Sequence, residues 1–372
     1  MKERNIGLDV TRIFAFLCVV SVHSLHFTSF YELPVDGIRM YLLCLFRALV
    51  NCCIPLFLLI SGYLLAGRTI DLQEKGSMRR HLRKCSGLIC TYLLAEAVIL
   101  TFRNTYLHAS LSWQEMLSHV LGFGGYGWYV NMYLGLYLLM PFVNLLWKNL
   151  SGKSAQRKFL LCLLVLTALP SITNVYDYTT PGALLQPWTY ITTNSLIPDW
   201  WASIYPLTAF FLGAYLREHV DISKLHTRKL LLLSCLAVLL CGSYNIWRSW
   251  KVLFVWGIWT NEGSLQTLLC AVLVFLTINS IHYRKPGPRA AQFLGCISEL
   301  TFGAYLVSWA TDQLVYQTLY RFYSDARIYT LCMPLTIASS AVLALLVAFL
   351  IRLAQAALFA LLRKVRKSPA GV

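Results

Sequence analysis

Long apolar stretches recur along the whole chain and are separated by short polar connections. A run of about 20 apolar residues makes a helix long enough to cross the hydrocarbon core of a membrane. The pattern therefore predicts an all-α, polytopic membrane helix bundle of about ten transmembrane helices. We expect these helices at residues 7–28, 41–66, 84–102, 127–147, 159–174, 201–216, 230–247, 264–281, 293–317 and 330–361.

The basic residues predict how this bundle is oriented. If the N-terminus lies in the cytoplasm, 25 of the 32 lysines and arginines fall on the cytoplasmic side, and the longest outer loop, 175–200, contains none. Short cytoplasmic loops carry such an excess of positive charge. Adding or removing one helix would destroy the alternation. We therefore expect ten crossings, with both termini in the cytoplasm.

The composition agrees with a membrane protein, since 58% of the residues are hydrophobic, only 13% are charged and the mean hydropathy is +0.60. The formal charge of +16 lies in short loops, which argues against nucleic acid as a partner. No stretch has the composition of a separate soluble domain. We expect one integral-membrane domain over residues 1–372, without an appended soluble domain, in the inner (plasma) membrane.

Ionisable side chains are costly inside a membrane and mark functional sites or structural ion pairs. Five of them share one depth in the outer halves of four predicted helices, and three residues at the start of a fifth helix lie at the same depth. These residues are His23, His26, Arg47, Glu96 and Asp312, together with Trp128, Tyr129 and Asn131. The pattern predicts a wet polar cavity, in which His23 is the candidate general base because a neutral imidazole accepts protons near pH 7.

Structural alternatives remain open for this layer. In one alternative, Arg47 pairs with Glu96 or Asp312 merely to neutralise charge between helices. In the other, the histidines are ordinary core side chains. For His26 we favour the core interpretation.

A second polar cluster lies at the predicted inner face, where Arg12 of the first helix is joined by Arg80, Arg83 and Lys84 before the third. Arginine forks bind phosphates with two parallel hydrogen bonds, so this cluster is a candidate anion site. The alternative is that these cations only set the topology. No cluster of metal-ligating residues is visible in the sequence, and we expect neither a metal nor a permanently bound cofactor.

Five stretches of the chain form an ordered set that resembles acyltransferase family 3, the integral-membrane acyltransferases. The matching stretches cover residues 8 to about 308. They are LDVTR at 8–12 followed by His23, PLFLLISGYLL at 55–65, RHLR at 80–83, GWYV at 127–130 with Tyr137 and MPF at 140–142, and SELTFGAYL at 298–306.

The resemblance implies a membrane O-acyltransferase, most often an O-acetyltransferase. Such an enzyme moves an acyl group from cytoplasmic acyl-CoA, here expected to be acetyl-CoA, to a hydroxyl of a cell-surface or lipid-linked glycan. By position, His23 corresponds to the catalytic histidine and Arg12 to the arginine of the first helix. The RxxR element falls on Arg80 and Arg83, and the SGY element on Ser61, Gly62 and Tyr63. The family's ninth helix commonly ends in histidine, and here that place is taken by Ser308.

The expected mechanism places the phosphates of acyl-CoA at Arg12, Arg80, Arg83 and Lys84, with His23 activating the acceptor hydroxyl. We expect Asp312 or Glu96 to orient the imidazole. Substrate contacts are expected from Trp128, Tyr129, Asn131, Arg47, Ser61 and Tyr63. The alternatives are a small-solute transporter of related fold and a non-catalytic membrane partner of polysaccharide assembly; no inverted repeat is apparent that would favour the transporter.

Overall fold

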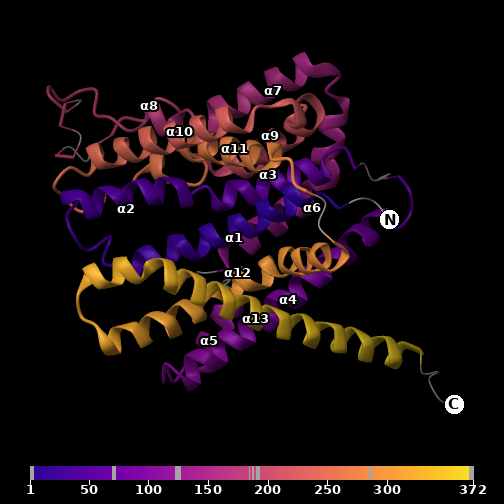
Figure 1. The fold of residues 1–372 in the computed structure, drawn as a ribbon. Coiled ribbons are helices and arrows are strands. Elements are labelled where there is room, and N and C mark those ends of the chain that lie inside the picture. Colours follow the sequence, from indigo (N-terminus) through magenta and orange to yellow (C-terminus); the bar gives the residue numbers. More distant parts are fainter. Residues whose placement is uncertain are drawn as a thin grey trace. The chain divides into compact units, whose positions relative to one another are not determined.

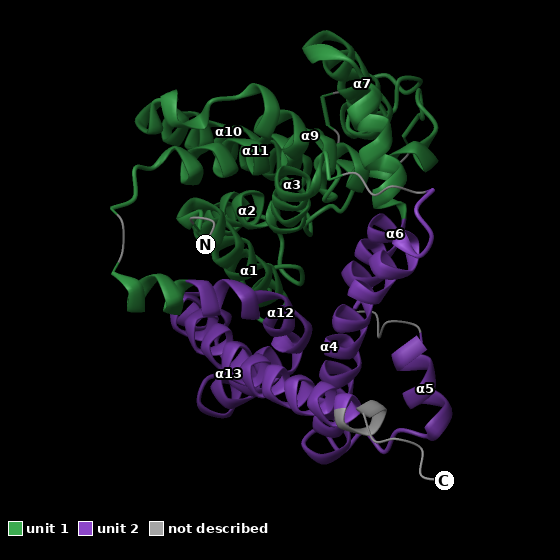
Figure 2. Ribbon diagram, turned by 90° about the vertical axis from the view of Figure 1, so that its right-hand side faces the viewer, with its two compact units in different colours: residues 1–69, 139–294 green, residues 70–138, 295–372 purple. Residues whose placement is uncertain are grey.

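A computed structural model describes residues 4–68, 73–121, 127–183, 185–186, 188–189, 193–284 and 287–367. In this part of the chain the secondary structure is helical, apart from one isolated bridge between Val35 and Trp250. The chain divides into two compact units, coloured separately in Figure 2. The first unit comprises residues 1–69 and 139–294, and the second comprises residues 70–138 and 295–372.

The helices follow one another along the chain as labelled in Figure 1. Their bounds are α1 Ile6–His26, α2 Gly37–Val50, α3 Cys53–Leu65, α4 Ser77–Thr105, α5 Trp113–Leu121, α6 Trp128–Asn149, α7 Gly152–Thr167, α8 Pro170–Thr173, η1 Asp199–Ile204, α9 Tyr205–His219, η2 Ile222–Lys224, α10 Thr227–Arg248, η3 Ile258–Thr260, α11 Leu265–Ser280, α12 Pro288–Phe322 and α13 Ala326–Lys367. The predicted all-α bundle is confirmed, because every predicted apolar window contains helix.

Within the described residues, nine helical segments are long and apolar enough to cross a membrane. They match nine of the ten predicted windows. The remaining predicted window, 201–216, contains η1 and the 15-residue α9, which follow each other without a gap. The short helix α5 was not predicted from the apolar pattern.

The predicted helix at 41–66 is interrupted, which corrects the expectation of one continuous helix. Helix α2 ends at Val50, and α3 begins at Cys53. Pro55 explains the break, because proline lacks an amide hydrogen and its ring clashes with the carbonyl four residues earlier, that of Asn51. The Asn51 side chain donates to the Thr260 carbonyl at 2.9 Å and to Thr267 Oγ1 at 3.1 Å, so the break is itself anchored.

The first unit is organised around the close packing of α3 on α9, its most extensive helix contact. A Cβ atom at Gly62 would lie only 1.8 Å from the carbonyl oxygen of Phe210, and one at Gly213 would lie 2.1 Å from that of Leu59. The two backbones therefore touch because neither glycine has a side chain. Helix α1 packs on α3, α2 and α11, and α10 packs on α2 and α11.

The second unit contains α4, α5, most of α12, all of α13 and the first half of α6. Helix α4 packs on α13, and Gln355 of α13 donates a hydrogen bond to the Gly87 carbonyl of α4 at 2.7 Å. Arg352 and Glu299 form an ion pair between α13 and α12 at 3.0 Å. Helix α13 is thus joined to both other long helices of the unit.

The contact at Gly62 predicts that Gly62→Ala destabilises the protein, since the added methyl group meets a backbone carbonyl that cannot rotate away. We expect a loss of about 1–3 kcal/mol in the free energy of unfolding. The measurement is thermal unfolding of the purified protein in detergent. Gly135→Ala is the matched control, because a Cβ there meets nothing within 4 Å, and the control is expected to unfold at or above the wild-type temperature. Equal unfolding temperatures for Gly62→Ala and wild type would contradict the proposed contact.

Candidate functional site

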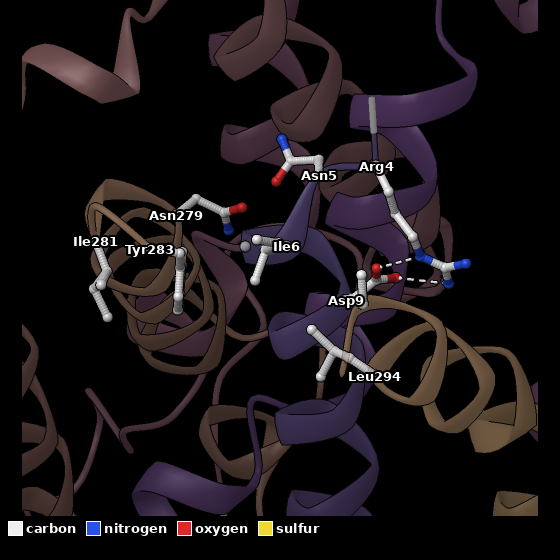
Figure 3. A pocket seen from close by; sticks show the side chains of 10 residues that line it. Arg4, Asn5, Ile6, Asp9, Asn279, Ile281, Tyr283 and Leu294 are labelled. Carbon is white, nitrogen blue, oxygen red and sulfur yellow. Dashed lines mark hydrogen bonds and ion pairs between the residues drawn. The ribbon is translucent and has the colours of Figure 1, made fainter. Parts of the chain in front are cut away.

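Helix α1 begins beside a buried carboxylate that binds two arginines. The Asn5 side chain caps the helix by accepting a hydrogen bond from the backbone N–H of Leu8 at 3.2 Å. Asp9 accepts from Arg4 Nε at 2.6 Å and from an Arg12 terminal nitrogen at 3.2 Å. Figure 3 shows the pairing of Arg4 with Asp9. One carboxylate therefore fixes two guanidinium groups at the end of α1 that the charge pattern places in the cytoplasm.

A hollow of about 390 Å³ lies beside this pair, and we call it the arginine hollow. It is lined by Arg4, Asn5, Leu8, Asp9, Arg12, Tyr63, Leu64, Arg68 and Arg217. Four arginines face a single carboxylate among these residues, so the lining carries a net positive charge. Guanidinium groups bind phosphate or carboxylate through paired N–H donors, and the hollow therefore suits an anion.

The wall of the arginine hollow is built by the end of α3. Arg217 reaches from α9 and donates to the backbone carbonyls of Tyr63 and Leu64 at 3.1 and 3.3 Å. These carbonyls lie in the last turn of α3, where they have no partner within the helix, and a cation there stabilises the helix end. Asn144 of α6 donates to the carbonyls of Leu65 and Arg68. The end of α3 is thus held from two sides.

A second hollow, of about 410 Å³, lies against the start of α1 and is drawn in Figure 3. It shares Arg4, Asn5 and Asp9 with the arginine hollow. Its far side is formed by the end of α11 and the chain that follows, with Asn279 and Tyr283 as polar lining residues. The second hollow is therefore partly polar.

The histidines of α1 lie at its other end. Eleven residues separate Arg12 from His23, which corresponds to about three turns, so the two side chains share a face about 16 Å apart along the axis. His23 is half-buried, and the ring of His26 lies 4.6 Å from that of Tyr31. Electrostatic interactions connect His26 with His23 and with Arg47. The predicted outer-layer residues of the first unit therefore form one cluster.

The three residues of the SGY element, Ser61, Gly62 and Tyr63, have different surroundings. Ser61 donates to the Phe57 carbonyl of its own helix at 2.8 Å, and Gly62 supplies the contact with α9. Only Tyr63 reaches a hollow, where it faces the arginines.

In the second unit, Glu96 is 2% exposed and its carboxylate lies 3.1 Å from His119 Nδ1. His119 comes from α5, which Tyr92 also ties to α4 by donating to the Val120 carbonyl at 2.9 Å. Nothing in the apolar pattern predicted that Glu96 pairs with His119. The pairing depends on α5 folding back onto α4.

Asp312 is fully buried in the second unit and accepts a hydrogen bond from Ser340 Oγ at 2.5 Å. Ser340 also lies 2.9 Å from Thr311 Oγ1, so these hydroxyls join α12 to α13 around the carboxylate.

The RxxR element lies in the first turns of α4, with its charged side chains exposed. Arg80 forms an ion pair with Glu74, while Arg83 and Lys84 point away from the core. At the start of α6, Tyr129 is buried against Tyr305 with a ring separation of 5.6 Å, whereas Trp128 and Asn131 are exposed. The predicted residues of the first unit thus form an Arg12–Tyr63 group and a His23–His26–Arg47 group, with Ser61 packed inside α3. The other predicted residues belong to the second unit.

Arg68 and Arg217 were not singled out in the sequence as site residues, because each resembles an ordinary topology signal. Only the fold shows that they line the same hollow as Arg12.

Comparison with known protein families gives a match over nearly the whole chain. Residues 5–353 match the family model described as an acyltransferase domain, that of acyltransferase family 3. No curated protein and no solved structure matches the chain. The match covers nearly all of the ten apolar windows and both ends of α1. The chain is a multi-pass membrane protein and belongs to acyltransferase family 3.

Proposed function

We propose that this acyltransferase moves an acyl group, most often acetyl, from cytoplasmic acyl-CoA to a hydroxyl of a cell-surface or lipid-linked glycan. His23 is the general base, and the protein works in the inner (plasma) membrane. The observation that carries the proposal is the layout of α1, which presents Arg12 in the arginine hollow and His23 three turns further along the same face.

The arginine hollow supports acyl-CoA as the donor. The nucleotide end of coenzyme A carries several phosphate charges, and four guanidinium groups line one open hollow on the predicted cytoplasmic side. In the second hollow, the Asn279 amide and the Tyr283 phenol offer hydrogen-bonding partners for the uncharged parts of the nucleotide. From there the long pantetheine arm extends along α1 and brings the thioester toward His23.

The transfer itself needs one proton acceptor and one stabilised negative charge. His23 takes the proton of the acceptor hydroxyl while the oxygen attacks the thioester carbonyl. The tetrahedral intermediate then collapses, the carbon–sulfur bond breaks, and the thiolate of coenzyme A leaves and receives a proton from the imidazolium. Donors aimed at the developing oxyanion lower this barrier.

The residues of the second unit keep the roles predicted for them from the sequence. We propose that Asp312 or Glu96 orients the imidazole and that Arg80, Arg83 and Lys84 add contacts to the donor. Tyr129, Asn131 and Trp128 are proposed acceptor contacts. Ser61, with its hydroxyl bonded inside α3, is proposed only to shape the wall beside Tyr63.

His23→Ala is expected to lower acyl transfer by ~100-fold to 10,000-fold, since general base catalysis contributes about that much. The measurement is label transferred from radiolabelled acetyl-CoA to glycan in membranes that contain the variant at wild-type level. His108→Asn is the matched control, because His108 is exposed in a loop and has a left-handed backbone that asparagine tolerates. Transfer by His23→Ala at the wild-type rate would eliminate this histidine as the base. Solute uptake without acyl-CoA would favour a transporter.

Arg68→Gln is expected to raise the KM for acetyl-CoA by ~10-fold, with a smaller effect on kcat, because it removes one charge-assisted contact to the donor. Arg68 is exposed and its side chain takes no part in the helix cap, so the fold is expected to persist. Arg157→Gln is the matched control, since it removes an exposed arginine from α7 on the same predicted side but outside the hollow. A KM that shifts equally in both variants would indicate a general surface-charge effect and contradict a donor site in the hollow.

A further inference from the structure

Arg47 is a buried cation whose guanidinium is enclosed by aromatic rings. Its side chain is 2% exposed, although it is charged. The guanidinium carbon lies 4.5 Å from the ring centroid of Phe254 and 4.7 Å from that of Trp256. Tyr31 closes a third side: its ring stacks on Trp256 at 4.8 Å, and its hydroxyl accepts a hydrogen bond from Arg47 Nε at 3.1 Å. We call Tyr31, Phe254 and Trp256 the aromatic clamp.

The clamp holds the side chain but does not neutralise it. Within the described residues of its own unit, Arg47 has no carboxylate partner, and its two terminal nitrogens donate no hydrogen bond. The groups that interact electrostatically with it are the His26 imidazole, the Tyr31 phenol and the Cys44 thiol. Burial raises the pKa of Tyr31 above its ordinary value, so the phenol stays protonated and uncharged.

The other clamped arginine of this unit shows what a purely structural role looks like. Arg248 lies 4.0 Å from the ring of Trp259, and one of its terminal nitrogens donates to the Val175 carbonyl at 2.6 Å. One arm of its guanidinium therefore ties the chain after α8 to α10. Arg47 also lies against aromatic rings, but its terminal nitrogens make no such bond to a carbonyl within the described residues of its unit.

We propose that Arg47 binds an anionic group, a carboxylate or a phosphate, of the glycan acceptor. The inference rests on the proposed function and specifies the class of acceptor. A planar fork with two free N–H-bearing nitrogens matches either anion with paired hydrogen bonds, and these are strong where water is excluded. Arg47 and His23 both interact electrostatically with His26, which packs against Tyr31 of the clamp, so we expect an acceptor held by its anion at Arg47 to bring a neighbouring hydroxyl toward His23.

The test is anion binding to the purified full-length protein in detergent, without acyl-CoA. Thermal unfolding is followed against increasing glucuronate, glucose 1-phosphate or glucose, since a ligand that binds the folded state raises the unfolding temperature. We expect glucuronate, glucose 1-phosphate or both to stabilise the wild type, and glucose to have no effect. A response to glucuronate alone identifies a sugar carboxylate, and one to glucose 1-phosphate alone identifies a sugar phosphate.

Arg47→Gln is expected to weaken this binding by ~10-fold or more, because the charge-assisted pair is lost. Arg47→Lys keeps the charge but not the planar fork, and it is also expected to weaken anion binding. It replaces Arg47→Gln in the test if the glutamine variant does not fold. Lys251→Gln is the matched control, since it removes an exposed cation from the loop that carries the clamp, and its affinity is expected to stay within about twofold of wild type. Anion affinity unchanged in Arg47→Gln or Arg47→Lys, or wild type stabilised equally by glucose, would overturn the proposal.

A transfer assay separates this proposal from the proposed function. With radiolabelled acetyl-CoA, wild type is expected to acetylate an anionic glycoside such as octyl β-glucuronide, or the corresponding phosphate, in preference to octyl β-glucoside. Arg47→Gln is expected to lose that preference. Anion binding without any transfer would contradict the proposed function and leave the anion site standing. Equal transfer to charged and neutral glycosides by wild type would overturn the role of Arg47 in acceptor choice.

Discussion

The direct contact between the backbones of α3 and α9 is the constraint on which the arginine hollow depends. It is possible only because Gly62 and Gly213 have no side chains at the crossing. Tyr63 follows Gly62 at once, and Arg217 lies one turn beyond Gly213, so the same crossing places both in the arginine hollow. Arg217 then caps the end of α3. Packing and binding are thus coupled: a shift of either helix would move a phenol and a guanidinium together.

The cations near the two ends of α1 have different partners. At the predicted cytoplasmic end, Asp9 binds Arg4 and Arg12, and this carboxylate sets the positions of the cations without matching their number. At the outer end, Arg47 is surrounded by rings and neutral groups. A buried cation attracts an anion more strongly than an exposed one, since less water screens it. One unit therefore carries positive charge near both ends of α1, where we propose that the acyl donor and the acceptor bind.

Hydropathy and length were enough to predict the long apolar helices, because a membrane leaves few alternatives to them. They were not enough at Pro55, where one residue breaks a window that hydropathy treats as continuous. The arginine hollow could not be predicted either. Arg68 and Arg217 are 149 positions apart and resemble topology signals, and only the α3–α9 crossing joins them. Two of the three clamp residues, Phe254 and Trp256, likewise come from a loop about 200 residues after Arg47, and in the sequence they resemble an interfacial aromatic belt.

The substitution at Ser308 sharpens the assignment of the base. Relatives with the motif commonly carry a histidine there, and a second imidazole would offer another proton acceptor. Ser308 is fully buried, and its hydroxyl donates to the Tyr305 carbonyl one turn earlier at 2.8 Å. A serine hydroxyl is a much weaker base near pH 7 than a neutral imidazole. In the proposed mechanism this proton goes to an imidazole of α1. His26 packs its ring against Tyr31 of the clamp, and the proposal assigns the base to His23, on the face of Arg12.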